Sequence, residues 1–320
     1  MQQPRSNSTS SPSSIPGVSS PQPPIRLILI DIFNTLLRPN PPPAHQYAKI
    51  ARHGRFSLPG HLLKDEPVSL AFKAAMKKQL ALHPNYGRDT LPPLPDGEAA
   101  ADRWWRLVIK ETIVDALSVY SEGKCSKKRA KELWAPAERR GICEEILLRF
   151  GKGGQAYELL EDVEPFLRGL AERNAKAKGG REVRIVLASN SDERILDACA
   201  ALGLGEGGQD VEDRGRDRDG ALLSYDLGHC KPSASFFSEA LRLAGGGEGN
   251  EAAIKGEEVL YVGDDLHEDA VAARDSGTGI TGVWLDREEK GRGDGKMEGV
   301  KRVVSLSEVL DLVDERQRSS

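Results

Sequence analysis

The stretch IRLILIDIFNTLL, residues 25–37, decides how this chain folds. Five of the six residues in 25–30 are aliphatic, which is typical of a parallel strand buried on both faces. Asp31 follows at once, where open α/β sheets place their ligands, and Asn34 and Thr35 suit a turn that faces the same crevice. Asp31 is therefore a candidate nucleophile, although an aspartate in this place can also simply cap a turn.

Strands and helices alternate through the second half of the chain. Their hydrophobic patterns predict strands over residues 183–188, 259–262, 281–285 and 303–304, and helices over residues 164–173, 192–202, 236–243, 269–275 and 307–313. Residues 205–220 are rich in glycine and charge, and we interpret them as a loop insertion. The alternation predicts an α/β protein with a parallel sheet and right-handed crossovers.

A helical segment interrupts this pattern. Residues 39–43 contain four prolines, and neither a helix nor a central strand can cross them. Helical periodicity then covers residues 70–82, a stretch from about Asp102 to residue 113, and residues 142–150. We therefore predict an inserted helical domain at 44–160, with the core formed by 25–43 and 161–320.

The composition excludes several classes of protein. The net charge is −4 and the pI about 6.0, which argues against non-specific nucleic-acid binding. No apolar run approaches the length of a membrane span, so we expect no membrane partner. The four cysteines form no CxxC pair, which fits a reducing cytoplasmic or nuclear compartment. Residues 1–24 are rich in Ser and Pro; they predict a disordered tail, with a transit peptide as an alternative.

Polar residues recur where later elements of the core begin or end. Ser189 and Asn190 follow a predicted strand, and they can donate to an anion or cap the next helix. Lys231 precedes a proline at a helix start, where its ammonium can meet an anion or lie in solvent. Both positions suit an anionic substrate if the elements converge.

The segment GDDLHED, residues 263–269, holds four acids directly after a predicted strand. Like charges this close either raise one another's pKa or hold a cation, and oxygen ligands select a hard ion such as Mg²⁺. A solvated acidic loop is the alternative. A carboxylate nucleophile, oxygen donors, a lysine and a Mg²⁺ cluster together suit transfer of an anionic group through an aspartyl intermediate.

Four segments resemble the haloacid dehalogenase-like hydrolase superfamily. They are DIFNTL at 31–36, SN at 189–190, GHCKP at 228–232 and GDDLHED at 263–269. HPNYG at 83–87 and WWRLVIKET at 104–112 are similar to its eukaryotic domain-containing protein 3 branch. Over about residues 25–320, the resemblance implies a Rossmann-like core with a helical C1-type cap inserted after the first motif.

The resemblance also implies roles for the motif residues. Asp31 would be the nucleophile, Ser189 and Asn190 would bind the phosphoryl group, and Lys231 would stabilise its charge. The implied Mg²⁺ ligands are Asp31, the Phe33 backbone carbonyl and Asp264, with Asp265 and Asp269 near or through water. The expected partner is a small-molecule substrate, and the oligomeric state stays open.

One position departs from the family pattern. Phe33 stands where family phosphatases usually have a second aspartate as general acid and base, whose loss costs roughly 10²–10⁴-fold in rate. An aromatic residue there is found in the dehalogenases, which need no Mg²⁺. Three readings remain: a Mg²⁺-dependent phosphatase, a dehalogenase-type hydrolase, and a catalytically weak protein that binds phosphate and Mg²⁺.

Three kinds of side chain near the motifs have open roles. His229 or His267 can replace the missing acid or lie exposed in solvent. Trp104 and Trp105 can line a pocket, although we expect at least one to pack in the helical core. Cys230, beside the lysine, is either a low-pKa thiol or buried and inert.

Overall fold

The computed structural model describes residues 22–92, 100–152, 154–179, 181–204, 221–246, 253–290 and 298–319. The predicted loop insertion at 205–220 and nearly all of the predicted tail lie outside these ranges.

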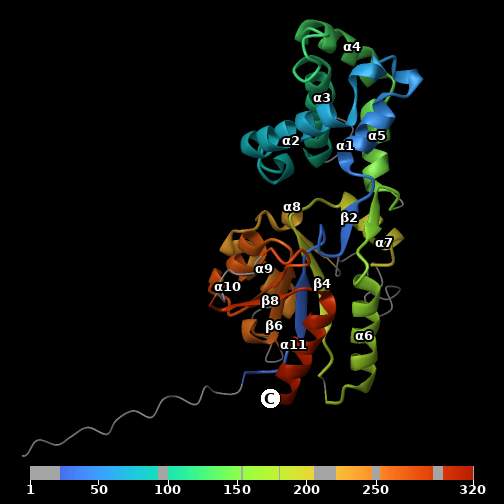
Figure 1. The fold of residues 1–320 in the computed structure, drawn as a ribbon. Coiled ribbons are helices and arrows are strands. Elements are labelled where there is room, and N and C mark those ends of the chain that lie inside the picture. The colour runs from blue at the N-terminus through green and yellow to red at the C-terminus, as the bar shows by residue number, and fades with distance from the viewer. Residues whose placement is uncertain are drawn as a thin grey trace, which may run out of the picture.

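A six-stranded parallel sheet forms the centre of the core, in the order β5-β4-β1-β6-β7-β8 (Figure 1). The central strand is β1, Leu27–Ile30, and all four of its side chains are fully buried. Its last residue, Ile30, pairs with Leu187 of β4 and Val262 of β6. The residues that follow these three strands therefore lie at one edge of the sheet. The other strands are β4 Arg184–Ser189, β5 Ala221–Leu223, β6 Val259–Gly263, β7 Thr281–Leu285 and β8 Val300–Val303.

Helices cover both faces of the sheet. Ile28 and Ile30 pack with α6, α7 and α11, whereas Leu27 and Leu29 pack with α9 and α10. Successive side chains of β1 point to opposite faces of the sheet, and helices cover both faces, so the strand is apolar at every position. These helices are α6 Val163–Lys176, α7 Arg194–Ala201, α9 Ala234–Gly245, α10 Ala272–Asp275 and α11 Leu306–Ser319, with the short α8 at Ser224–Leu227. The predicted α/β class is confirmed.

A separate helical unit lies beyond the sheet edge that bears the motifs (Figure 1). Its own buried cluster includes Tyr47, Phe56, Ile113 and Trp134. Two short strands, β2 Leu37–Pro39 and β3 Tyr157–Leu159, pair antiparallel where the chain enters and leaves the unit. Its helices are α1 Pro43–Ala51, α2 Asp65–Leu82, α3 Ala100–Ser118, α4 Lys127–Arg139 and α5 Ile142–Gly151.

Several elements differ from the sequence prediction. The helix expected over 269–275 begins as a π-helical turn, Leu266–Val271, and only Ala272–Asp275 is α-helical. The strand expected at 303–304 is β8, which begins three residues earlier. The helices α1 and α4 were not predicted, because α1 begins on a proline and α4 contains Pro136. The strands β2, β3 and β5 escaped prediction because each has three residues.

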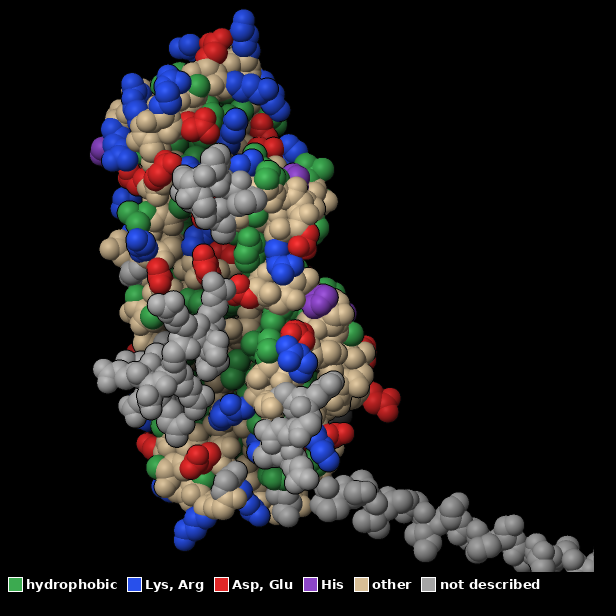
Figure 2. All heavy atoms as spheres, turned by 180° about the vertical axis from the view of Figure 1, so that it is seen from behind, with side chains coloured by type: hydrophobic (Ala, Val, Ile, Leu, Met, Phe, Trp, Pro, Cys, Tyr) green, Lys and Arg blue, Asp and Glu red, His purple; other side chains and the backbone are tan. Residues whose placement is uncertain are grey.

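Basic side chains gather over the outer end of the helical unit, as Figure 2 shows. Exposed lysines of α4, among them Lys127, Lys128 and Lys131, belong to this end. None of the helices in the described ranges combines the length and the apolar character that crossing a bilayer demands.

Candidate active site

Asp31 occupies the end of β1 and is almost fully buried, with 5% of its surface exposed. Its Oδ1 accepts a hydrogen bond from the Ser189 hydroxyl at 2.7 Å and another from the Lys231 ammonium at 2.7 Å. Ser189 ends the adjacent strand β4, and Lys231 precedes α9. Parallel pairing of β1 with β4 therefore brings Ser189 to Asp31 across 158 sequence positions, and the segment before α9 brings Lys231 to Asp31 across 200.

Lys231 is held by its backbone as well as by its side chain. Asn190 Oδ1 accepts from the Lys231 N–H at 2.8 Å, and Asn190 Nδ2 donates to the Lys231 carbonyl at 3.1 Å. The ammonium also donates to Asp269 Oδ1 at 2.6 Å. Burial lowers the pKa of Lys231, but the Asp31 charge and further contacts raise it more, so the pKa lies well above its usual value. The ammonium therefore stays charged at neutral pH.

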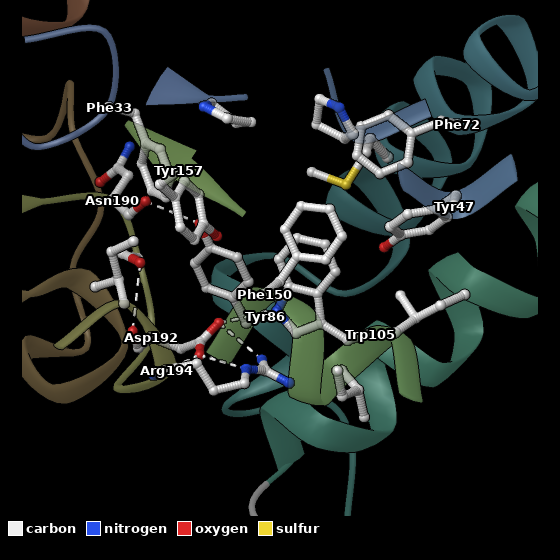
Figure 3. Close-up of a pocket in the computed structure, with 17 residues that line it drawn as sticks. Phe33, Tyr47, Phe72, Tyr86, Trp105, Phe150, Tyr157, Asn190, Asp192 and Arg194 are labelled. Carbon is white, nitrogen blue, oxygen red and sulfur yellow. Dashed lines mark hydrogen bonds and ion pairs between the residues drawn. The ribbon is translucent and has the colours of Figure 1, made fainter. Parts of the chain in front are cut away.

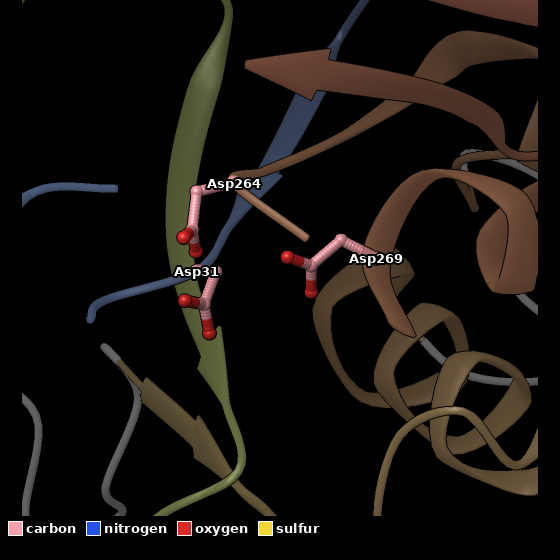
Figure 4. A group of neighbouring side chains, drawn as sticks. All are labelled: Asp31, Asp264 and Asp269. Carbon is pink, nitrogen blue, oxygen red and sulfur yellow. The ribbon is translucent and has the colours of Figure 1, made fainter. Parts of the chain in front are cut away.

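Three carboxylates form an acidic group beyond β1 and β6 (Figure 4). Asp31, Asp264 and Asp269 each present an oxygen within 4.8 Å of those of the other two. Burial and the nearby Asp31 charge raise the pKa of Asp264 to about 6 and that of Asp269 to about 7. Repulsion between the carboxylates favours the binding of a cation at this group.

Backbone contacts fix the two acids after β6. A Cβ added to Gly263 would lie 2.1 Å from Asp269 Oδ2, so only glycine allows this approach. The Asp265 N–H donates to Asp269 Oδ2 at 3.0 Å, and the Asp264 N–H donates to the Thr35 hydroxyl at 3.1 Å. Thr35, which we expected to face the crevice, thus holds the motif after β1 against the motif after β6.

Asp265 lies outside the three-carboxylate group. Its Oδ1 accepts from the backbone N–H groups of His267 and Glu268, both at 2.8 Å, and so caps the π-helical turn. The donor set fits a hard divalent ion, because three carboxylates share this site with a single ammonium. Oxygen ligands of this kind are those that Mg²⁺ prefers.

The histidine, cysteine and tryptophan candidates differ in their exposure to solvent. His229 and His267 are both exposed, and neither lines the cavity described below. Burial raises the pKa of the half-buried Cys230 thiol, so the low-pKa reading is wrong. Trp104 is fully buried and donates to the His83 carbonyl at 2.9 Å, as expected of a packed residue.

A cavity of about 270 Å³ lies between the helical unit and the core (Figure 3). Phe33 lines it and packs against Tyr157 with ring centroids 6.1 Å apart. Trp105 lines it too, stacked on Tyr86 at 6.1 Å. The lining residues are Phe33, Pro39, Pro43, Tyr47, Phe72, Met76, Tyr86, Trp105, Ile146, Leu147, Phe150, Tyr157, Asn190, Ser191, Asp192, Arg194 and Ile195.

One segment of the helical unit reaches across to the core. Asn85 and Tyr86 both have left-handed backbones, with φ of 48° and 55°. This geometry lets Asn85 Nδ2 donate to the Ser224 carbonyl at 2.7 Å and the Tyr86 hydroxyl donate to the Asn190 carbonyl at 2.8 Å. Sequence reasoning missed both roles. Their strained backbone was not readable, because neither residue is glycine.

An ion-pair cluster also crosses the cavity wall. Arg194 bonds both oxygens of Asp192 at 2.9 Å, and Trp105 Nε1 donates to Asp192 Oδ2 at 2.9 Å. The sequence pattern predicted only that a helix starts at Asp192. The signal that could have indicated the ion pair is an acid and an arginine two residues apart, shortly after Ser189.

Comparisons with known proteins identify the family of this chain. A sequence model of the family described as haloacid dehalogenase-like hydrolase matches residues 25–277. The chain therefore belongs to the haloacid dehalogenase-like hydrolase family, and the prediction of a hydrolase is confirmed at that level.

Within the family, the chain is similar to haloacid dehalogenase-like hydrolase domain-containing protein 3 of Bos taurus. The two are 30% identical over 222 residues, which cover 69% of each chain. It is also 24% identical over 254 residues to the rhythmically expressed gene 2 protein of Drosophila melanogaster, covering 79% of this chain and 80% of that protein. The branch resemblance is thus confirmed.

The fold is shared with a solved structure, the 2-haloacid dehalogenase of Pseudomonas syringae. The TM-score is 0.50 at 17% identity, over 91% of this chain and 99% of the dehalogenase. At this identity the likeness concerns the fold alone.

Proposed function

We propose that this protein hydrolyses small phosphate monoesters through an aspartyl-phosphate intermediate, with Mg²⁺ as cofactor. One observation carries the proposal: a buried carboxylate, Asp31, shares a single site with an ammonium and two further acids. Such a site combines a nucleophile with groups that neutralise a phosphoryl charge.

The residues have distinct tasks in this reaction. Asp31 attacks phosphorus, and the bond from phosphorus to the ester oxygen breaks with its electron pair on the leaving oxygen. Water then attacks phosphorus, releases inorganic phosphate and regenerates the Asp31 carboxylate. Lys231 keeps its positive charge throughout, and Ser189 holds the carboxylate in place with it; both can also donate to phosphoryl oxygens.

The metal has a defined set of protein ligands in this proposal. Asp31, Asp264 and the Phe33 backbone carbonyl would hold Mg²⁺, with Asp269 near or through water. Asp265 contributes its N–H to Asp269 and its carboxylate to the cap of the following turn. When bound, Mg²⁺ supplies positive charge that lowers the repulsion between carboxylate and phosphate.

A second candidate function is dehalogenase-type hydrolysis, and Phe33 favours it. Its ring lines an apolar cavity, and a halide leaves without needing a proton. The acidic group favours the phosphatase, because the carbon–halogen bond that a dehalogenase attacks carries no phosphoryl charge for a metal to offset. A 2-haloacid would also need a cation for its carboxylate, and the lining Arg194 is already paired with Asp192.

The deciding experiment is turnover of p-nitrophenyl phosphate with and without Mg²⁺. We expect hydrolysis that requires Mg²⁺ and falls at least roughly a thousandfold in Asp31→Asn. Asp275→Asn is the matched control, because Asp275 is exposed and bonds only its neighbour Arg274 in the described structure. Metal and phosphate binding without Asp31-dependent turnover would instead indicate a regulatory binding protein. Halide release without Mg²⁺ would indicate a dehalogenase.

A further inference from the structure

We propose that the substrate is an aryl phosphate: a phosphate monoester whose leaving group is an uncharged aromatic ring system that occupies the cavity between the helical unit and the core. This inference rests on the proposed function, since it names the substrate class of the same site. Three observations carry it: the size and chemistry of the cavity, the state of its charged groups, and the absence of a suitable proton donor in its described lining.

The cavity is built for flat apolar groups. Of the 17 residues around it, seven have aromatic side chains, and these come from both the core and the helical unit (Figure 3). An apolar cavity of about 150 Å³ holds a benzene molecule, so about 270 Å³ has room for a ring system of roughly two fused rings. The aromatic residues are Phe33, Tyr47, Phe72, Tyr86, Trp105, Phe150 and Tyr157.

The charged residues of the lining are satisfied by one another. Asp192 and Arg194 are the two charged side chains among the lining residues, and they are joined by two hydrogen bonds of 2.9 Å. Arg194 further bonds Asp102 at 2.9 Å, and Asp192 accepts from Trp105. A second anionic group on a substrate would therefore find no uncommitted cation in this lining and would lose its hydration.

Two of the lining residues belong to the segments that carry the nucleophile and its hydroxyl partner. Phe33 lies two residues after Asp31, and Asn190 follows Ser189, which bonds Asp31. When the phosphate of a substrate is bound at Asp31, we expect its ester substituent to enter the cavity next to Phe33 and Asn190. The ring system then extends toward Trp105 and Met76 of the helical unit.

The leaving oxygen meets no efficient proton donor in this lining. Both oxygens of Asp192 are paired with Arg194, and the Tyr86 hydroxyl already donates to the Asn190 carbonyl. Burial also raises the pKa of the lining tyrosines Tyr47, Tyr86 and Tyr157 above the usual value for tyrosine. A general acid works best when its pKa lies near the working pH. A phenolate, whose conjugate acid has a pKa near 10, can leave unprotonated far more readily than an alkoxide.

The chemical step balances without such a donor. Asp31 forms a bond to phosphorus, and the bond from phosphorus to the aryl oxygen breaks with its electron pair on that oxygen. The phenolate departs and takes a proton from bulk water. Water then cleaves the phosphoaspartate at phosphorus, and its proton goes to solvent or to the released phosphate.

The test compares kcat/KM for matched phosphate esters on the whole protein with Mg²⁺. The first pair is 2-naphthyl phosphate and its 6-sulfonate, which share the leaving oxygen and differ in charge at the far end of the ring. We expect the sulfonate to be poorer by roughly ten- to hundredfold, because apolar burial is lost. The second pair is phenyl and benzyl phosphate, and we expect phenyl phosphate to be at least tenfold better.

A pair of variants on one helix locates the effect. Met76→Lys places a charge in the cavity wall of α2, whereas Leu80→Lys changes a residue of α2 that is 44% exposed. We expect Met76→Lys to lower kcat/KM for 2-naphthyl phosphate at least tenfold, and to lower it much less for acetyl phosphate, which has no ring to occupy the cavity. Leu80→Lys should leave the hydrolysis of both substrates unchanged.

The outcomes separate this inference from the proposed function. If aliphatic and sulfonated esters are turned over as well as aryl esters by the unmodified protein, the aryl inference is overturned while the phosphatase stands. If no phosphate ester shows Asp31-dependent turnover, the proposed function itself fails. The comparison of substrates on the unmodified protein decides the inference even if Met76→Lys does not fold.

Discussion

Arg194 and Asp102 join the two parts of the molecule, because Arg194 Nη1 at the start of α7 donates to Asp102 Oδ1 of α3 at 2.9 Å. The same guanidinium holds Asp192, whose side chain is 6% exposed. One arginine thus connects the helical unit to the core beside the cavity. Asp102 is more exposed than Asp192, so breaking the two ion pairs should change the stability of the protein by different amounts.

The first prediction concerns this arginine. Asp102→Asn removes a half-buried partner and should cost at most about 1 kcal/mol in free energy of unfolding while raising KM. Arg194→Met leaves the Asp192 carboxylate buried without its cation and should cost about 3 kcal/mol. Urea denaturation measures both. Lys78→Met, which breaks the exposed pair with Glu111, is the control, and equal losses in all three variants would contradict the account.

The second prediction concerns the close approach after β6. Gly263→Ala places a methyl group where Asp269 Oδ2 lies, so the carboxylate must move. We expect a loss of about 1–3 kcal/mol in stability and at least tenfold weaker Mg²⁺ binding by calorimetry. Gly54→Ala is the control, because no atom lies within 4 Å of the added Cβ. Unchanged Mg²⁺ affinity in Gly263→Ala would remove Asp269 from the metal site.

The third prediction is a pH dependence of the metal-free protein. Asp264 and Asp269 have folded-state pKa values of about 6 and about 7, above the value of roughly 3.9 for an unfolded aspartate. The folded state therefore binds more protons than the unfolded state between these values. Its stability must fall as the pH rises from about 4 to about 7.

Mg²⁺ should reverse this trend, because the metal binds the ionised carboxylates. We expect the rise in Tm caused by Mg²⁺ to be larger at pH 8 than at pH 5.5, and the half-saturating Mg²⁺ concentration to be roughly tenfold lower at pH 8. Thermal denaturation with and without Mg²⁺ measures this. The pH dependence should shrink in Asp264→Asn, and a Mg²⁺ effect that is the same at both pH values would contradict it.

The fourth prediction concerns the buried lysine. Lys231→Met leaves the carboxylates of Asp31 and Asp269 without their shared ammonium. We expect kcat to fall roughly 10²–10³-fold, and a stability loss of about 3 kcal/mol at pH 8 that is smaller at pH 5.5, where Asp269 is protonated. Lys128→Met, on the exposed face of α4, is the control. A variant with normal kcat would show that Lys231 is structural only.

The sequence was sufficient to predict the sheet and the acidic site, because both depend on local patterns. The aliphatic run before Asp31 and the one before Gly263 each indicate a buried strand. Parallel pairing then forces their ends together, so the neighbourhood of Asp31 and Asp264 follows from topology.

The cavity could not be predicted in the same way, because its walls come from two separately packed units. Trp105 and Tyr86 approach the core through hydrogen bonds to Asp192 and Asn190, over sequence separations of 87 and 104 residues. No periodicity encodes such contacts. Asp265 was predicted to lie near the metal or to contact it through water, and spacing alone does not reveal that its carboxylate caps a turn.

The central claim is that Asp31 becomes phosphorylated, and rapid-quench trapping tests it most directly. The protein is mixed with Mg²⁺ and a radiolabelled aryl phosphate, then quenched in acid within the first turnover. The account predicts a protein-bound phosphoryl group that survives acid, is lost in alkali, maps to the peptide containing Asp31 and is absent in Asp31→Asn. Turnover with no such adduct, or an adduct on another residue, would contradict it.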